Sequence, residues 1–114
     1  MEPLYIKDFE ALTHQQVVEM LPIWLSQLEY GGTLEFACLD FAYVIDLYAC
    51  NHDSLSEVST LLFEGGRRAV WSEISIARML LLNGFAKVWT GRVEEYPKHM
   101  FYVKAMKLVS TSFI

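Results

Sequence analysis

The sequence predicts one α/β domain, built as a mixed sheet of about four strands with helices packed on it. Three observations predict it: a length of 114 residues, an apolar fraction of 54%, and the order of the segments along the chain. That order is strand, helix, strand, helices, strand, strand, for which helices layered on a mostly parallel sheet are the usual packing. We therefore expect residues 1–114 to form a single domain.

The first elements are a possible short strand at Leu4–Ile6 and a helix that begins at Thr13. Thr13-His14-Gln15-Gln16 fits the capping box, in which side chains satisfy the free amides of a helix start. Pro22 removes one helical hydrogen bond and predicts a kink or a restart. Gly31-Gly32 predicts the helix end. Apolar residues three and four apart predict the buried face: Val17, Val18, Leu21, Trp24, Leu25 and Leu28.

The segment Thr33–Leu39 has the length and composition of a strand. Its apolar residues occupy both alternations, which predicts that both of its faces are covered. Asp40 then suits the cap of a helix that carries Phe41, Val44, Ile45 and Tyr48 on one side.

A second helical stretch is expected from Ser54 to Phe63, where Ser54–Glu57 resembles another capping box. A third helix should run from Ser72 to about Asn83, and Asn83-Gly84 is a stop signal. Its expected buried face consists of Ile74, Ala77, Leu80 and Leu81. The last two expected strands are 86–90 and 100–108, joined by a long hairpin connection over Gly91–Lys98.

The charges divide unevenly along the chain. Residues 1–66 hold eleven acidic residues and one basic residue, a net of −10, whereas residues 67–114 hold three acidic and eight basic residues, a net of +5. We favour the interpretation that the two halves pack together in one domain, where the charges on their facing rims neutralise each other. The alternative is that the acidic half of one subunit meets the basic half of another. The basic residues are scattered singly and the pI is about 5.1, so we expect no nucleic-acid partner.

The longest apolar run, Phe41–Ile45, is five residues long, against the roughly 20 that a membrane-spanning helix needs. We expect no membrane partner. The N-terminus lacks the pattern of a secretory signal, which predicts a cytoplasmic protein, or one of the host cytoplasm or virion if the protein is viral. Cys38 and Cys50 lack the spacing of a zinc or redox motif and are interpreted as small buried apolar residues.

Five segments of the chain, in order, resemble class I S-adenosylmethionine-dependent methyltransferases. Glu10–Val17 is similar to "LEHLSHEEV", and Leu28–Leu34 to "LKPGGTL". Leu39-Asp40-Phe41, together with Leu47-Tyr48, is similar to "VPDL … LY". Leu61–Gly66 is similar to "LLFGG", and Leu80–Val88 is similar to "LLLEAGFEKV". The resemblance covers roughly residues 4 to 107. It implies a truncated Rossmann-like fold that corresponds to the C-terminal half of the family, strands four to seven.

The family binds its cofactor on a glycine-rich turn after its first strand. This chain contains no G-x-G, and its glycine pairs match family positions that shape turns. Ala11 also stands where the family often has histidine. The resemblance therefore implies that the chain has no cofactor of its own and would hold S-adenosylmethionine only if a partner completed the fold.

Glu10 and Asp40 are the weak candidates for cofactor binding. Glu10 matches the glutamate of "LEH" near the cofactor edge, and Asp40 ends a strand at the side where open α/β sheets place ligands. The structural alternatives are a solvated loop residue for Glu10 and a helix cap for Asp40, and we favour the cap. No catalytic residue and no metal site is predicted, because His14, His52 and His99 share no ligand spacing along one element.

In the family the fourth strand lies beside the first, so Leu4, Tyr5 and Ile6 are expected to form an unpaired edge and an interface. Our leading hypothesis is a non-catalytic, methyltransferase-like protein that associates with itself or with another protein. One alternative is half of a split methyltransferase that a partner completes. Another is a structural component of a virus particle, since methyltransferase-like reading frames are frequent in phage genomes.

Overall fold

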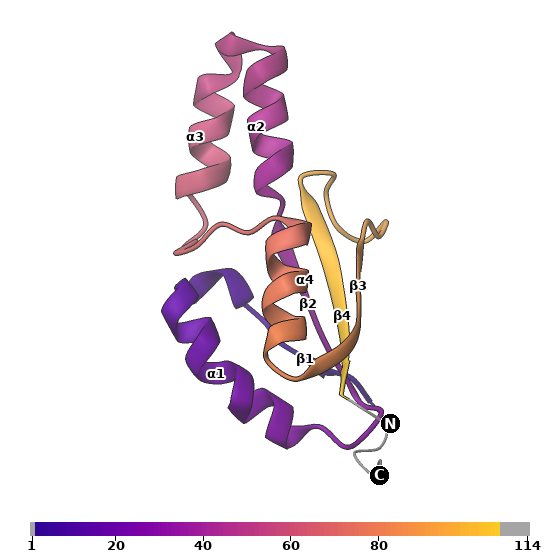
Figure 1. Ribbon diagram of the computed structural model, residues 1–114. Helices are drawn as coiled ribbons and strands as arrows, with labels where there is room; N and C mark the ends of the chain where they lie inside the picture. Colours follow the sequence, from indigo (N-terminus) through magenta and orange to yellow (C-terminus); the bar gives the residue numbers. More distant parts are fainter. Residues whose placement is uncertain (1, 108–114) are drawn as a thin grey trace.

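The computed structural model describes residues 2–107 and contains a four-stranded sheet with the order β1-β2-β4-β3 (Figure 1). Its strands are β1 (Leu4–Tyr5), β2 (Thr33–Leu39), β3 (Phe85–Gly91) and β4 (Met100–Lys107). β1 runs parallel to β2, whereas β4 is antiparallel to both β2 and β3. The predicted α/β class and the mixed four-stranded sheet are confirmed, but only one of the three strand pairs is parallel.

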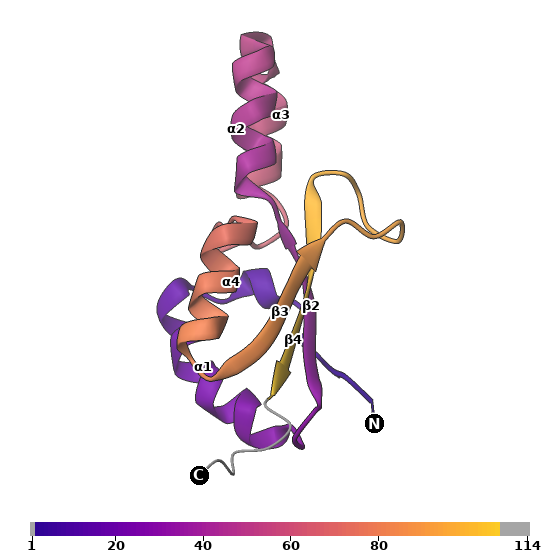
Figure 2. The ribbon, with the colours of Figure 1, turned by 45° about the vertical axis from the view of Figure 1, so that its right-hand side comes forward.

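Four α-helices accompany the sheet: α1 (His14–Gln27), α2 (Phe41–Cys50), α3 (Leu55–Phe63) and α4 (Glu73–Leu82). Short 3-10 turns, η1 (Phe9–Ala11) and η2 (His52–Ser54), precede α1 and α3. α1 and α4 lie on the same side of the sheet, and α2 and α3 form a helical hairpin that projects beyond its end (Figure 2). The projection makes the molecule elongated, with extents of 57 × 24 × 22 Å.

α1 begins as predicted. The Thr13 side chain accepts from the Gln16 amide while the Gln16 side chain accepts from the Thr13 amide, which completes the capping box. The expected break at Pro22 is absent, and the helix continues to Gln27. Pro22 is exposed, so its ring meets solvent and water can reach the carbonyl that loses its partner. The glycine pair follows the helix end rather than forming it, and Gly31, with φ 83°, turns the chain into β2.

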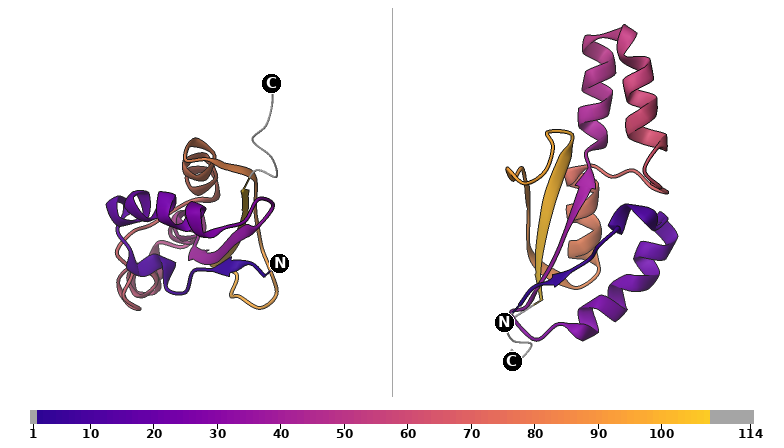
Figure 3. Two further views of the ribbon diagram at one scale, coloured as in Figure 1. Left: turned by 90° about the horizontal axis from the view of Figure 1, so that it is seen from below. Right: turned by 180° about the vertical axis from the view of Figure 1, so that it is seen from behind.

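Alternate residues of β2 and β4 point at α1 and α4 and form one core with them. This core contains three fully buried residues from each strand: Leu34, Phe36 and Cys38 from β2, and Phe101, Val103 and Ala105 from β4. The prediction that both faces of β2 are covered was wrong. Within residues 2–107, the other face of the sheet carries no helix, as the end-on view shows (Figure 3). Val18, predicted to be buried, is 46% exposed because α1 presents only a narrow stripe to the sheet.

α4 packs on the sheet with only part of the predicted face, since Leu80 is buried as expected but Ile74 and Leu81 are not. Ile76 and Leu80 are buried, but Ile74 and Leu81 are 72% and 54% exposed. The helix carries two overlapping stripes of apolar residues, and packing against the sheet buries only one of them. Its start agrees with the prediction, since Ser72 and Ser75 form a capping box.

The α2–α3 hairpin has a polar turn at its tip. Ser54 was predicted to cap α3, but its hydroxyl donates instead to the carbonyls of Asn51 (2.6 Å) and Leu47 (3.3 Å). Asn51 caps the η2 turn through its side-chain oxygen, which accepts from the Asp53 amide. Cys38 is buried as predicted, whereas Cys50, near this tip, is exposed. In the part of the chain described, no helix combines the length and the apolarity that crossing a membrane requires.

Candidate functional site

The carboxyl end of β2 holds both acidic residues that the sequence singled out. Asp40 ends β2 and caps α2, as the structural alternative predicted, since its Oδ1 accepts from the Ala42 amide at 3.0 Å. Its Oδ2 accepts from the Arg92 guanidinium, and a second nitrogen of Arg92 donates to the carbonyl of Met100 at 2.6 Å. Both carboxylate oxygens of Asp40 are therefore engaged, and the pair ties the start of α2 to the β3–β4 connection.

Glu10 is not the solvated loop residue of the structural alternative. Its Oε2 accepts from the amide of Leu39 at 3.0 Å and from Nε of Arg67 at 2.6 Å, and both charged side chains are 15% exposed. Arg67 also donates to the carbonyls of Leu61 and Glu64 at the end of α3. This ion pair fastens the hairpin to the sheet, which is a structural task for Glu10.

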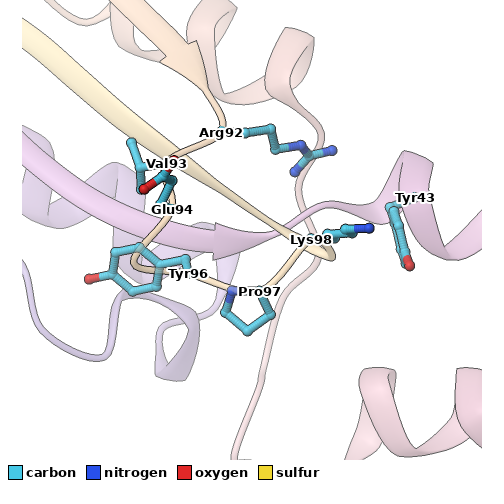
Figure 4. Close-up of a pocket in the computed structure, with 7 residues that line it drawn as sticks. All are labelled: Tyr43, Arg92, Val93, Glu94, Tyr96, Pro97 and Lys98. Carbon is cyan, nitrogen blue, oxygen red and sulfur yellow. The ribbon is translucent and has the colours of Figure 1, made fainter.

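A pocket with a volume of about 580 Å³ opens beside the Asp40–Arg92 pair, between the start of α2 and the β3–β4 loop (Figure 4). We call it the loop pocket; it is lined by Tyr43, Arg92, Val93, Glu94, Tyr96, Pro97 and Lys98. Neither Glu10 nor Asp40 lines it. The guanidinium of Arg92 is committed to Asp40, which leaves Glu94 and Lys98 as exposed charges of opposite sign in the lining.

The histidines and cysteines form no common centre. No group of three or more His, Cys, Asp or Glu side chains in residues 2–107 is arranged to hold a metal ion. His14 contacts the carbonyl of Val70 at 2.9 Å, and His52 stacks on Tyr48. Burial raises the pKa of the Cys38 thiol, which keeps it protonated and unreactive.

The segment Leu4–Ile6 occupies one edge of the sheet, as the sequence predicted. β1 is only two residues long, and the amide of Ile6 adds one further bond to the carbonyl of Glu35 at 2.9 Å. Leu4 and Ile6 pack against the core, while the ring of Tyr5 lies outside it and is 45% exposed. So short an edge offers few hydrogen bonds to a strand of a partner.

A larger apolar surface lies on the hairpin, which sequence reasoning did not identify as an interface. One side of α2 and one side of α3 line a groove of about 280 Å³. We call this the hairpin groove; its residues are Phe41, Val44, Ile45, Tyr48, Leu55, Val58 and Leu62. They repeat at three and four residues on both helices, the signal that could have revealed it. Ile45, Tyr48 and Leu55 are exposed, and Phe63, just beyond the groove, is 78% exposed.

Comparisons with known proteins show the fold alone. No protein-family model matches the chain, and no curated protein matches its sequence. Among solved structures, the chain is similar to a possible exported protein from Bordetella parapertussis, with a TM-score of 0.62 and 16% sequence identity. The match covers 91% of this chain and 37% of that protein, so the chain spans little more than a third of the protein it resembles.

Proposed function

We propose that this chain is a non-catalytic, methyltransferase-like protein that acts through protein–protein association, and that its hairpin groove receives α4 of a second copy. The observation that carries the proposal is the uncovered groove. Two packed helices can shield only one side of each other, and here three large apolar residues of the groove stay exposed: Ile45, Tyr48 and Leu55. Exposed apolar surface of this kind marks interaction sites.

The second copy offers an exposed, largely apolar surface on α4. The residues Ile74, Arg78, Leu81 and Leu82 follow one another at intervals of four, three and one, so they lie on one face of the helix. All are exposed, and Leu82 is 79% exposed. We call them the α4 face. A helix that lays an apolar face into a groove between two others is a recurring mode of recognition.

The charges of the two surfaces are complementary. The hairpin, residues 41–63, contains Asp46, Asp53 and Glu57 and no lysine or arginine. All three acids are exposed. The α4 face contains Arg78, with exposed Lys87 following in β3. Opposite charges steer such a pair of surfaces together, and two acidic hairpins facing each other would repel.

The state of Glu10 and Asp40 supports a non-catalytic role. Each carboxylate is paired with an arginine, and each also accepts from a backbone amide. A carboxylate held in this way has its hydrogen-bonding capacity taken up by partners within the fold, which leaves it poorly placed to hold a ligand.

Groove and α4 face are different surfaces, so the contact is head to tail. Each added copy leaves one groove and one α4 face free, and the assembly grows with concentration unless it closes into a ring. Size-exclusion chromatography with light scattering should therefore give masses above the 13.2 kDa of one chain, rising with concentration.

Two substitutions test the two sides of the contact. Leu55→Glu in the groove and Arg78→Glu on α4 should each weaken association at least about tenfold, since each places a like or unmatched charge in an apolar contact. Val18→Glu is the matched control, because Val18 is as exposed as the groove residues but lies on α1. The combination Glu57→Lys with Arg78→Glu should restore association, since opposite charges face each other again.

Two outcomes contradict the proposal. If the protein has the mass of one chain at every concentration, it does not associate with itself. A dimer that does not grow, and that Arg78→Glu leaves intact, shows that α4 is not the occupant of the groove.

The position of β1 favours a second candidate, one half of a split methyltransferase. β1 lies at the edge of the sheet, where the resembling family pairs its fourth strand with its first. A partner that supplies the missing strands and the glycine-rich turn would add to this edge. Calorimetry with S-adenosylmethionine tests the point. Tight binding to the isolated chain would contradict the non-catalytic proposal. Binding that develops only when such a partner is added would favour the split enzyme.

A further inference from the structure

The face of the sheet opposite α1 and α4 carries a row of aromatic and charged residues. Tyr5, Glu35, Lys104 and Trp89 are direct neighbours in register across β1, β2, β4 and β3. Tyr102 lies two residues from Lys104 on the same face of β4. Sequence reasoning missed this face because the apolar residues of Thr33–Leu39 suggested a strand covered on both sides.

The tyrosines on this face are held in place by hydrogen bonds. The hydroxyls of Tyr5 and Tyr96 lie 2.6 Å apart, which fixes the β3–β4 loop against the sheet. The Tyr102 hydroxyl donates to Oε1 of Glu35 at 2.8 Å, and the Thr33 hydroxyl donates to Oε2 at 3.1 Å. The rings of Tyr96 and Tyr102 lie 5.7 Å apart. Because these groups are fixed to one another, a ligand would meet a surface that is already organised.

Between the loop and the sheet lies a second pocket of about 350 Å³, which shares Val93 and Tyr96 with the loop pocket. We call it the tyrosine pocket; its lining residues are Glu35, Val93, Glu95, Tyr96, Tyr102 and Lys104. Two carboxylates face one ammonium group, so its formal charge is −1. The Lys104 ammonium lies over Trp89, 5.9 Å from the ring centroid, where the π face of the indole stabilises it.

We propose that the tyrosine pocket binds an organic ammonium group. Aromatic faces attract cations through the ring quadrupole, and quaternary ammonium ligands are recognised by cages of aromatic side chains. Tyr96 and Tyr102 supply the rings, and Glu35 and Glu95 supply the balancing charge. An anionic ligand would meet these two carboxylates, and it is therefore disfavoured. The ammonium group can belong to a small molecule or to a methylated lysine side chain of a peptide.

The probes are choline and its neutral isostere 3,3-dimethyl-1-butanol, titrated into the isotope-labelled protein and followed by NMR at equal ionic strength. Choline should shift the signals of Tyr96, Tyr102 and Glu95 in a saturable way, and the neutral alcohol should bind at least about tenfold more weakly. A peptide that carries trimethyllysine, with its unmodified form as the control, separates the two sources. If the trimethyllysine peptide binds more tightly than choline, the natural ligand is a peptide. If it binds equally or more weakly, the natural ligand is a small molecule.

Charge variants keep the test independent of folding. Glu95 and Lys104 are both exposed, so their replacement leaves the core intact. Glu95→Gln should weaken choline binding several-fold, whereas Lys104→Gln should strengthen it by removing a like charge. Tyr102→Phe should retain binding because the ring remains, and Tyr102→Leu should lose it.

Tyr43→Leu is the control. Tyr43 lines the loop pocket but not the tyrosine pocket, so this substitution should leave choline binding unchanged. Absence of saturable shifts, equal binding of the neutral alcohol, or weaker binding by Lys104→Gln would each overturn the proposal. The association-weakened variant Leu55→Glu should bind choline normally, so failure of association and failure of this site are separable.

Discussion

The body of the molecule and its projecting hairpin differ sharply in how much apolar surface they bury. The body, made of the sheet with α1 and α4, has a continuous core of fifteen buried residues. The hairpin cluster contains three: Leu39, Val44 and Val58. A pair of short helices with so small a core gains little from its own packing. We therefore expect the body to be the more stable region and the hairpin to depend more on its anchor, the Glu10–Arg67 ion pair.

The largest expected effect is in the body. Phe36 is fully buried and stacks on Phe9 with ring centroids 3.8 Å apart. Phe36→Ala should lower the free energy of unfolding by about 3–5 kcal/mol. Val44→Ala in the hairpin should lower the free energy of unfolding by only about 1–2 kcal/mol, because it removes fewer buried carbon atoms and they come from a smaller core. Chemical denaturation measures both, and equal losses would remove the distinction between the two regions.

The anchor of the hairpin should come next in size. Arg67→Met removes the charge that pairs with Glu10 and three donated hydrogen bonds. The unpaired Glu10 carboxylate then lies in a site that is largely buried, at an expected cost of about 2 kcal/mol. Hydrogen exchange should speed up in α2 and α3 and remain slow in β4. The comparison variant is Arg92→Met. Because the Arg92 side chain is 45% exposed, this substitution should lower the free energy of unfolding by less than Arg67→Met does. Uniform acceleration across the body would contradict the role of anchor.

The smallest expected effect concerns Tyr5 at alkaline pH. The hydrogen bond to Tyr96, together with burial, raises the pKa of Tyr5 from 10.0 to about 12. The folded state therefore holds this proton more tightly than the unfolded state does. The stabilisation is fully present below the ordinary pKa and is lost as the pH rises through the folded value. Tyr5→Phe should make the alkaline loss of stability shallower, as followed by denaturation at several pH values, and an unchanged slope would contradict it.

Local signals predicted the elements of this fold well. Thr13 marks a helix start through a capping box that depends only on neighbouring residues, and the bounds of Thr33–Leu39 follow from composition. The similar pattern at Ser54 forms no cap, because its hydroxyl donates to the preceding turn. The face that each element buries was harder to predict. α4 carries two apolar stripes, and the choice of Ile76 over Ile74 depends on the position of the sheet, which no local pattern contains.

The candidate sites show the same division. Asp40 as a cap is a local property, and it was predicted. The pairing of Glu10 with Arg67 joins residues 57 positions apart, and the tyrosine pocket joins β2, the β3–β4 loop and β4. Such contacts arise only when the sheet is assembled. The uneven charge along the chain was visible in the sequence, yet within residues 2–107 its two halves are joined by only two ion pairs, Glu10–Arg67 and Asp40–Arg92.

The most direct test of the central claim is hydrogen exchange measured by mass spectrometry at low and at high protein concentration. If a second copy covers the hairpin groove, peptides from α2, α3 and α4 become more protected as the concentration rises, while peptides from β2 and β4 stay unchanged. Protection of the hairpin that is independent of concentration, in a chain that remains a monomer, would contradict the account.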